Sequence, residues 1–360
     1  MTPRIAQIQR FWPLVLLALP GGCSSPDTGE GHSRSAPERD TVFATGDDEP
    51  LRPLEPPITV EPALIELGQT LFHDGRLSRD GDISCASCHP LDSAGVDAFE
   101  VSVGADGRVG TRNAPTVFNA ARNFVQFWDG RARTLEEQID GPVHNPVEMA
   151  TDWPTVTRQL AADLHMRRAF RAAFADDRIN PSRIRTAIAA FERSLITSNS
   201  AFDRYLLGDG GAISARARDG YALFKNIGCA SCHQGENVGG SMFQKLGVVI
   251  PYGRSTSDSG DTAMSELNPP DTEDTGRYLL TGDPADRYVF RVPSLRLAVA
   301  TAPYFHHGEV QSLAEAVAAM AWFQLGISLD QNEIELIVEF LRTLPGEYDG
   351  VPICQSVECA

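Results

Sequence analysis

The chain has 360 residues, of which 42% are hydrophobic and 22% are charged, and its formal net charge is −17. This composition is typical of a folded globular protein, and the length is enough for about two domains. The acidic balance argues against a nucleic-acid-binding protein, which needs basic patches. No stretch after residue 22 reaches the roughly 18 apolar residues that span a bilayer, so a multispan membrane protein is excluded.

Residues 1–22 have the features of a secretory signal peptide. Two arginines precede a short apolar segment, and a small residue then precedes Cys23. This ending resembles a bacterial lipoprotein cleavage site, although Pro20 stands where a small or apolar residue is usual. We expect a periplasmic protein tethered to the membrane through a lipid on Cys23, and the alternative is an ordinary secreted protein. Residues 23–52 are rich in Ser, Pro, Gly and charged residues and predict a lipid-anchored disordered linker.

Helical periodicity dominates the rest of the chain. Apolar residues recur at helical spacing in four segments, each opened by a capping residue. These segments are 152–174 (capped by Asp152), 180–195 (Asn180 followed by Pro181), 312–325 (Ser312 with Glu315 in a capping box) and 330–344 (Asp330). Gly- and Asp-rich stretches at 208–211 and 253–287 predict loops, and the first is the expected domain boundary. Strand-like alternation is scarce, so the predicted fold class is mainly α.

Two identical five-residue strings carry the most specific chemistry. They are Cys85-Ala86-Ser87-Cys88-His89 and Cys229-Ala230-Ser231-Cys232-His233. Two thiols one helical turn apart can add to the two vinyl groups of one haem, and the adjacent histidine then lies under the iron as its axial ligand. A redox CxxC motif would not need the histidine, and a zinc site would gather four ligands around one metal. The two strings therefore predict two covalently bound c-type haems, which agrees with export from the cytoplasm.

The sixth iron ligands decide between an electron carrier and an enzyme. A carrier would have two six-coordinate irons, whereas an enzyme would keep one iron open to substrate. Met320 lies on a predicted helix after His233, and a thioether opposite histidine raises the haem potential and favours electron transfer. Met242 and Met264 compete for this position, and a core role is also common for methionine on an apolar helix face.

Further strings resemble those of the bacterial dihaem cytochrome c peroxidase family over about residues 60–345. Besides the haem motifs and the Met320 helix, they are Leu71–Ser78, Asn113–Asn119, Phe127–Arg131, Pro293–Arg296 and Thr301–His306. The resemblance implies two cytochrome-c-like haem domains packed across a shared interface. The expected divisions are an N-terminal peroxidatic domain at 53–207, a C-terminal electron-transfer domain at 208–345 and a tail at 346–360.

The resemblance also implies residue roles. His89 and His233 would be the proximal ligands, and Met320 would be the sixth ligand of the second haem. Trp128 would lie between the two haems, where the alternative is simple packing at the interface. Glu148 matches the acid/base group of the peroxide pocket and Gln138 its polar neighbour. Oxygen ligands suit calcium, and the matching interdomain calcium site comprises Asn113, Thr301 and Pro303.

The loop after the first haem motif departs from the family pattern. Many members carry a histidine there after a Ser-x-Gly sequence, and it ligates the first iron until the second haem is reduced. This chain reads Ser102-Val103-Gly104-Ala105, and alanine cannot ligate iron. We therefore expect a first haem that is open without reductive activation, and the alternative is a remote ligand, His73 or His144. The departure also resembles the related enzyme that matures methylamine dehydrogenase, but that enzyme uses tyrosine where this chain has Met320.

The predicted activity is reduction of hydrogen peroxide to water with electrons from a small periplasmic c-type cytochrome or cupredoxin. The acidic charge favours a donor with a basic or neutral docking face. The alternatives are a peroxide-dependent protein-modifying dihaem oxidase and a dihaem electron carrier. A homodimer is compatible with the resemblance, and Cys354 with Cys359 can form a local disulfide in an oxidising compartment.

Overall fold

A computed structural model describes residues 49–252, 274–356 and 359 of the chain. Four predicted features lie outside these residues: the signal peptide, the lipid on Cys23, most of the linker, and Met264 as a candidate ligand. The described residues belong to one compact unit, and none of their helices is long and apolar enough to cross a bilayer.

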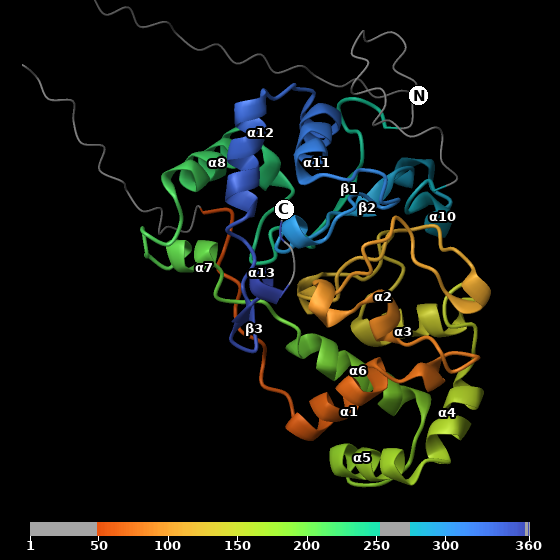
Figure 1. Ribbon diagram of the computed structural model, residues 1–360. Coiled ribbons are helices and arrows are strands. Elements are labelled where there is room, and N and C mark those ends of the chain that lie inside the picture. Colours follow the sequence, from red (N-terminus) through yellow and green to blue (C-terminus); the bar gives the residue numbers. More distant parts are fainter. Residues whose placement is uncertain (1–48, 253–273, 357–358, 360) are drawn as a thin grey trace, which may run out of the picture. The chain divides into compact units, whose positions relative to one another are not determined.

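The described part of the chain is mainly α, as predicted (Figure 1). Its α-helices are α1 (Pro62–Phe72), α2 (Cys85–Cys88), α3 (Leu135–His144), α4 (Trp153–Ala161), α5 (Leu164–Phe174), α6 (Pro181–Ser194), α7 (Ala201–Leu206), α8 (Ala215–Asn226), α10 (Tyr278–Thr281), α11 (Leu313–Met320), α12 (Gln331–Leu341) and α13 (Ile353–Ser356). Two short antiparallel pairs supply the sheet: β1 (Phe243–Lys245) with β2 (Val289–Arg291), and β3 (Glu347–Tyr348) with β4 (Val351–Pro352).

The predicted caps are confirmed, but several helix ends differ from the prediction. The side chains of Asp152, Asn180, Ser312 and Asp330 each accept a backbone hydrogen bond at the start of a helix. The single helix expected over 152–174 is two helices, because Asp163 accepts a hydrogen bond from the His165 N–H and caps a second start. The helix expected to reach residue 325 ends at Met320 and continues as one π-helical turn, Ala321–Leu325. The last predicted helix ends at Leu341 rather than at residue 344.

Of the two predicted loops, the first is described completely and the second only in part. Residues 208–211 connect α7 to α8 without helix or strand, but the expected division into domains there stays a prediction. The described end of the loop predicted at 253–287 contains α10 and a short 3-10 turn, Pro284–Asp286.

The two halves of the chain each contain a hydrophobic core built on a pair of crossing helices. In the first half, α1 packs on α6, and Gly68 permits the approach because a Cβ there would lie 1.9 Å from the Ala187 carbonyl oxygen. In the second half, α8 packs on α12, and Gly220 plays the same part against the Leu336 carbonyl oxygen, also 1.9 Å away. Figure 1 shows both helix pairs. Each core lies beside one CxxCH string, so the two halves repeat one design.

A third hydrophobic cluster brings residues of both halves together. Its buried members come from the second half and include Tyr252, Phe290 and Phe323, and Trp128 of the first half packs against them. The backbones also meet at this place, since the Arg291 N–H donates to the Trp128 carbonyl over 2.8 Å. Burial of these apolar rings therefore orders the segment around Trp128 relative to β2.

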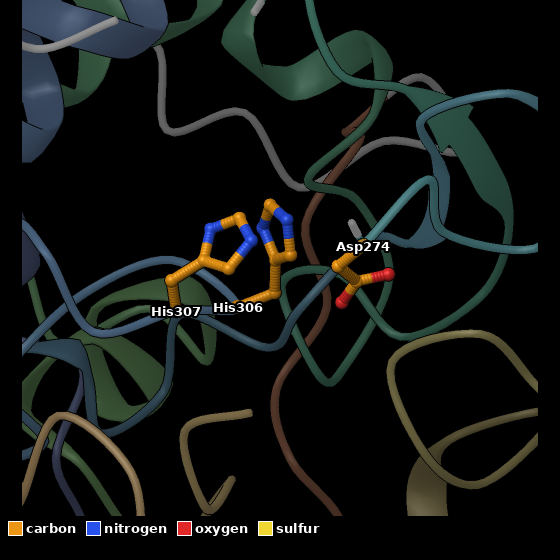
Figure 2. Close-up of side chains that lie close together, drawn as sticks. All are labelled: Asp274, His306 and His307. Atoms are coloured by element: carbon orange, nitrogen blue, oxygen red, sulfur yellow. The ribbon is translucent and has the colours of Figure 1, made fainter. Parts of the chain in front are cut away.

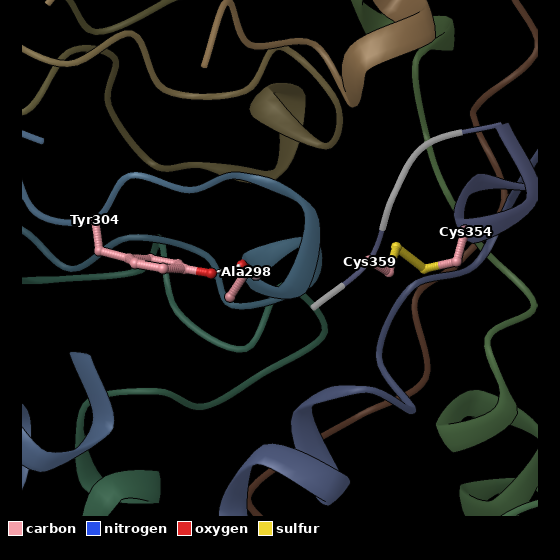
Figure 3. Close-up of a disulfide and its surroundings, with 4 residues drawn as sticks. All are labelled: Ala298, Tyr304, Cys354 and Cys359. Carbon is pink, nitrogen blue, oxygen red and sulfur yellow. Dashed lines mark hydrogen bonds between the residues drawn. A yellow bond between two sulfur atoms is a disulfide. The ribbon is translucent and has the colours of Figure 1, made fainter. Parts of the chain in front are cut away.

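The C-terminal tail carries a disulfide between Cys354 and Cys359 (Figure 3). The structure thus settles a pairing that the sequence left open. Figure 3 also shows the Tyr304 hydroxyl donating to the Ala298 carbonyl over 2.8 Å, which ties down the segment that precedes His306.

Candidate functional site

Each CxxCH string forms one tight helical turn. Cys85 to Cys88 make up α2, and Ser84 and Ser87 cap it reciprocally. The second string forms a 3-10 turn, Cys229–Ser231. In both, the backbone N–H of the histidine donates to the carbonyl of the first cysteine over 3.0 Å, which closes the turn. The four cysteines are in no disulfide, so their thiols are available for thioether bonds.

Both motif histidines are oriented by a backbone carbonyl. The Nδ1 of His89 lies 3.1 Å from the Gly95 oxygen, and the Nδ1 of His233 lies 3.4 Å from the Val238 oxygen. A proton held at Nδ1 leaves Nε2 unprotonated and able to bind a metal. Burial lowers the pKa of both rings, that of His233 to about 4, so both are neutral at neutral pH.

The first string opens into a cavity of about 670 Å³. The predicted site residues that line it are Cys85, Cys88, His89, Asn113, Trp128, Gln138 and Glu148. Among the described residues lining it, His89 is the only histidine. His73 and His144, the remote ligands considered above, are exposed, and each directs Nδ1 to a carbonyl of its own helix region. Gln138 and Glu148, the predicted catalytic residues, thus lie around one cavity with His89, and no second described histidine lines it.

The loop that carries Ala105 packs against the backbone of Glu148. The Ala105 N–H donates to the Glu148 carbonyl over 2.8 Å. A Cβ at Gly104 would lie 2.1 Å from the Val147 oxygen and 2.7 Å from the Glu148 Cα, so only glycine permits this approach. The Ser102–Ala105 segment is thereby held at the wall of the first cavity, which Ser102 and Gly104 line.

The Glu148 carboxyl group is partly desolvated. Burial raises its pKa, while a hydrogen bond from Asn145 and the nearby charge of Arg131 act in the opposite direction. The Asn145 Nδ2 donates to Oε1 over 2.6 Å. A raised pKa suits a group that must both accept and release a proton near neutral pH.

Two functional candidates were missed from the sequence. One is Asn145, whose role depends on the chain turn after α3. The other is Glu192, a buried carboxyl group at the wall of the first cavity, whose Oε2 has no hydrogen-bond partner and whose pKa burial raises to about 8. The sequence did carry a signal for Glu192, because it stands next to Phe191 on the apolar face of the predicted 180–195 helix, where a charged residue is unusual.

The second string opens into a cavity of about 210 Å³. Cys229, Cys232, His233 and Met320 line it together, and Met242 does not. Met320 ends α11, where the helix changes to the π-helical turn. Of the two described candidates, Met320 is thus the one whose thioether shares a cavity with His233.

Trp128 and Arg291 line both cavities. The Trp128 Nε1 donates to the Asn113 carbonyl over 2.9 Å, which fixes the indole in this shared wall. Arg291 is 3% exposed and its Nη1 has no hydrogen-bond partner, and burial lowers its pKa to about 10. Burying an unpaired cation is unfavourable, so this site fits an anionic group such as a haem carboxylate. The unpartnered, buried Nε2 of His306 at the second cavity fits one as well.

The residues of the predicted calcium site lie on two segments that touch. The Asn113 N–H donates to the His306 carbonyl over 2.8 Å, and the Asn113 Nδ2 donates to the Phe99 carbonyl over 2.9 Å. Thr301 and Pro303 lie on the second segment, where the Ala302–Pro303 peptide bond is cis. Calcium binding by these three residues stays a prediction.

A separate group of possible ligands lies beside that segment. Potential ligand atoms of Asp274, His306 and His307 fall within 4.8 Å of one another, and Figure 2 shows the two imidazoles side by side. The Asp274 carboxylate is already engaged, because Arg112 pairs with it through Nε over 2.6 Å and Nη2 over 2.8 Å. The sequence placed only His306 in a family string and gave no reason to join it with Asp274.

Comparison with known proteins agrees with this geometry. A model of the di-haem cytochrome c peroxidase family matches residues 62–211. Cytochrome c551 peroxidase of Nitrosomonas europaea is 42% identical over 300 residues, covering 83% of this chain and 85% of that protein. Methylamine utilization protein MauG of Methylophilus methylotrophus is 31% identical over 308 residues, covering 82% and 85%.

A solved structure has a similar fold. The crystal structure of a MauG-like protein associated with microbial copper homeostasis aligns with a TM-score of 0.70 at 27% identity, covering 84% of this chain and 96% of that one. The two CxxCH turns, their cavities and these relatives together establish two c-type haems and an oxidoreductase that acts on peroxide. The chain belongs to the dihaem cytochrome c peroxidase family.

Proposed function

We propose that this protein is a periplasmic dihaem peroxidase that reduces hydrogen peroxide to water with electrons from a small c-type cytochrome or cupredoxin, without prior reductive activation. The observation that carries the proposal is the first cavity. It combines His89, Gln138 and Glu148 and, among its described lining residues, contains no second histidine.

The haems would be held by the two CxxCH strings and by Met320. When bound, they supply the iron and the redox equivalents for peroxide reduction. Glu148 takes a proton from one peroxide oxygen and returns it to the other as the O–O bond breaks. Gln138 orients the peroxide through its amide group. Overall, one peroxide, two electrons and two protons give two waters.

Trp128 is proposed to carry electrons between the two halves. Its place in the wall of both cavities supports this role, because no other aromatic side chain of the described residues lines both. Its hydrogen bond to the Asn113 carbonyl keeps the ring in one orientation. The haem site of His233 and Met320 would then receive electrons from the donor, and the haem site of His89 would use them to reduce peroxide.

The absence of reductive activation is proposed from Ala105. Alanine offers no iron ligand. The hydrogen bond from its N–H to the Glu148 carbonyl holds the loop against the backbone of Glu148, so the oxidised enzyme is proposed to have an open pocket without any movement of this loop. The relatives named MauG leave a second candidate, a peroxide-dependent oxidase that modifies a protein. Ala105 is compatible with both functions, whereas a methionine at position 320 favours the peroxidase.

Further features of the proposal lie at the edges of the site. We include a calcium ion held by the Asn113 side chain and the carbonyls of Thr301 and Pro303, and a lipid anchor on Cys23. Removal of calcium with a chelator is expected to reduce peroxidase activity and to lower the melting temperature, and calcium should restore both. A chelator-treated enzyme that lacks calcium yet keeps both properties would exclude the ion.

The deciding experiment is peroxide-dependent oxidation of a reduced small c-type cytochrome by the fully oxidised enzyme. Rapid turnover without pre-reduction is the expected result. Turnover only after half-reduction would mean that another ligand closes the first haem. Peroxide reaction without cytochrome oxidation in either state would favour the protein-modifying oxidase.

A further inference from the structure

A row of aromatic side chains leads away from the wall between the two cavities. The Trp128 ring centroid lies 6.3 Å from that of His306, and His306 lies 6.0 Å from Tyr252. Tyr252 in turn lies 6.5 Å from Tyr288. Figure 2 shows the ring of His306, the second member of this row. All of these rings except that of His306 belong to the third hydrophobic cluster or pack against it.

The row is buried in its middle, where His306 is 2% exposed, and both of its ends, Trp128 and Tyr288, are partly exposed. Tyr252 is 5% exposed, whereas Tyr288 is half-buried and lies in the turn directly before β2. Neither tyrosine lines either cavity. Trp128 is thus linked, ring by ring, to a partly exposed tyrosine, Tyr288, through His306 and Tyr252, to which the proposed peroxidase mechanism assigns no step.

The chemistry of these side chains suits electron transfer. Indole and phenol are among the protein side chains most readily oxidised by one electron, and separations of about 6 Å are those of ordinary aromatic contacts. The imidazole of His306 lies within ring-contact distance of both Trp128 and Tyr252.

We propose that Tyr288 is a second electron-donating site, which supplies electrons through Tyr252 to Trp128 when no cytochrome is available and is itself reduced by small phenolic compounds. The proposal rests on the role proposed above for Trp128. Hydrogen peroxide takes two electrons and two protons and gives two waters. These electrons and protons come from two successive passes along the row, in each of which Tyr288 loses one electron and one proton. Each tyrosyl radical then takes a hydrogen atom from a phenol, which restores Tyr288 and releases a phenoxyl radical.

The test is to locate the radical in the holoenzyme. The enzyme is treated with hydrogen peroxide and a nitroso spin trap without cytochrome, peroxide loss is recorded, and the adduct is found by peptide mass spectrometry. We expect the adduct on Tyr288, and we expect Tyr252→Phe to lose most of it. Tyr278→Phe is the matched control, because Tyr278 is also half-buried and close in sequence but stacks on Arg287 instead of on the row.

Several outcomes would overturn the route. Peroxide consumption with no adduct on Tyr288 would do so, as would an equal adduct yield in Tyr252→Phe. An adduct on Trp322 instead of Tyr288 would also do so, because Trp322 packs against the same cluster and would then be the residue that donates electrons at the end of the route. If the fully oxidised enzyme consumes no peroxide, the proposal on activation fails instead, and the half-reduced enzyme then gives the same test. Cytochrome-dependent turnover should be unchanged in both tyrosine variants, which separates the route from the main activity.

Discussion

Asn145 and Glu148 are joined by a hydrogen bond of 2.6 Å from the amide Nδ2 to the carboxylate Oε1 at the turn that follows α3. The bond stabilises the ionised form of Glu148, whereas burial of the carboxyl group favours the protonated form. Burial is the larger of the two effects, so the pKa of Glu148 lies above its ordinary value. The balance between them leaves this group able to exchange a proton within the cavity.

Asn145→Ala should therefore raise the pKa of Glu148 further. Because the proposed base must be ionised to accept a proton, the acidic limb of the kcat/KM profile should move to higher pH, and activity should fall mainly below neutral pH. The measurement is the pH profile of peroxide-dependent cytochrome oxidation. Asn226→Ala, at an exposed position on α8, should leave the profile unchanged. An unshifted profile in Asn145→Ala would show that the amide does not control this proton.

Glu148→Gln should remove the proton acceptor while keeping the size of the side chain. We expect kcat/KM for peroxide to fall by about 10²–10⁴-fold, the usual contribution of a positioned acid or base. Both haem absorption spectra should remain those of the parent protein. Glu137→Gln is the control, since that exposed carboxylate pairs only with Arg133. Parent-level turnover in Glu148→Gln would assign proton transfer to another group, and Glu192 would be the next to replace.

Ala105→His should restore the histidine ligand of the first iron that many family members carry in this loop. The expected result is an oxidised enzyme with little activity, which regains turnover after the second haem is reduced. Val103→His is the matched control, because it adds an imidazole to the same loop at an exposed position. The assay compares initial rates with and without pre-reduction. If Ala105→His stays fully active when oxidised, the identity of this residue does not decide activation.

Met320→Leu should leave the second iron without its thioether. Because a thioether opposite histidine raises the haem potential, the reduction potential of the second haem should fall, and its absorption spectrum should lose low-spin character. Met242→Leu should change neither, since Met242 does not line the second cavity. Spectroelectrochemical titration of both variants measures the effect. A change in Met242→Leu alone would reverse the ligand assignment.

Arg296→Met should lower the stability of the fold, although Arg296 lines neither cavity. Arg296 is fully buried and pairs with Asp203 over 2.7 Å, while it also donates to the carbonyls of Glu236 and Arg52. Removing one partner of a buried pair costs about 3–5 kcal/mol in the free energy of unfolding. Arg216→Met, which breaks an exposed pair with Glu335, should cost only about 0–1 kcal/mol. Denaturant unfolding followed by circular dichroism compares the two.

The sequence predicted best where the chemistry is local. A CxxCH string needs only five consecutive residues to define two thioethers and a ligand, and a capping residue needs only the next turn of backbone. The haem motifs and the four helix starts followed from this. The helix predicted over 152–174 was wrong because two capping residues, Asp152 and Asp163, compete within one apolar pattern, and the second begins a helix of its own.

What the sequence by itself determined was therefore the identity of the cofactors, the helical class and a set of site residues named through family resemblance. Only the tertiary structure decided that Trp128 and Arg291 share one wall, that Asn145 holds Glu148, that a buried Glu192 faces the first cavity, and that Tyr252 and Tyr288 continue a row of rings from that wall. These relationships join residues through burial and side-chain direction. Packing of the whole chain sets both, and no local spacing encodes them.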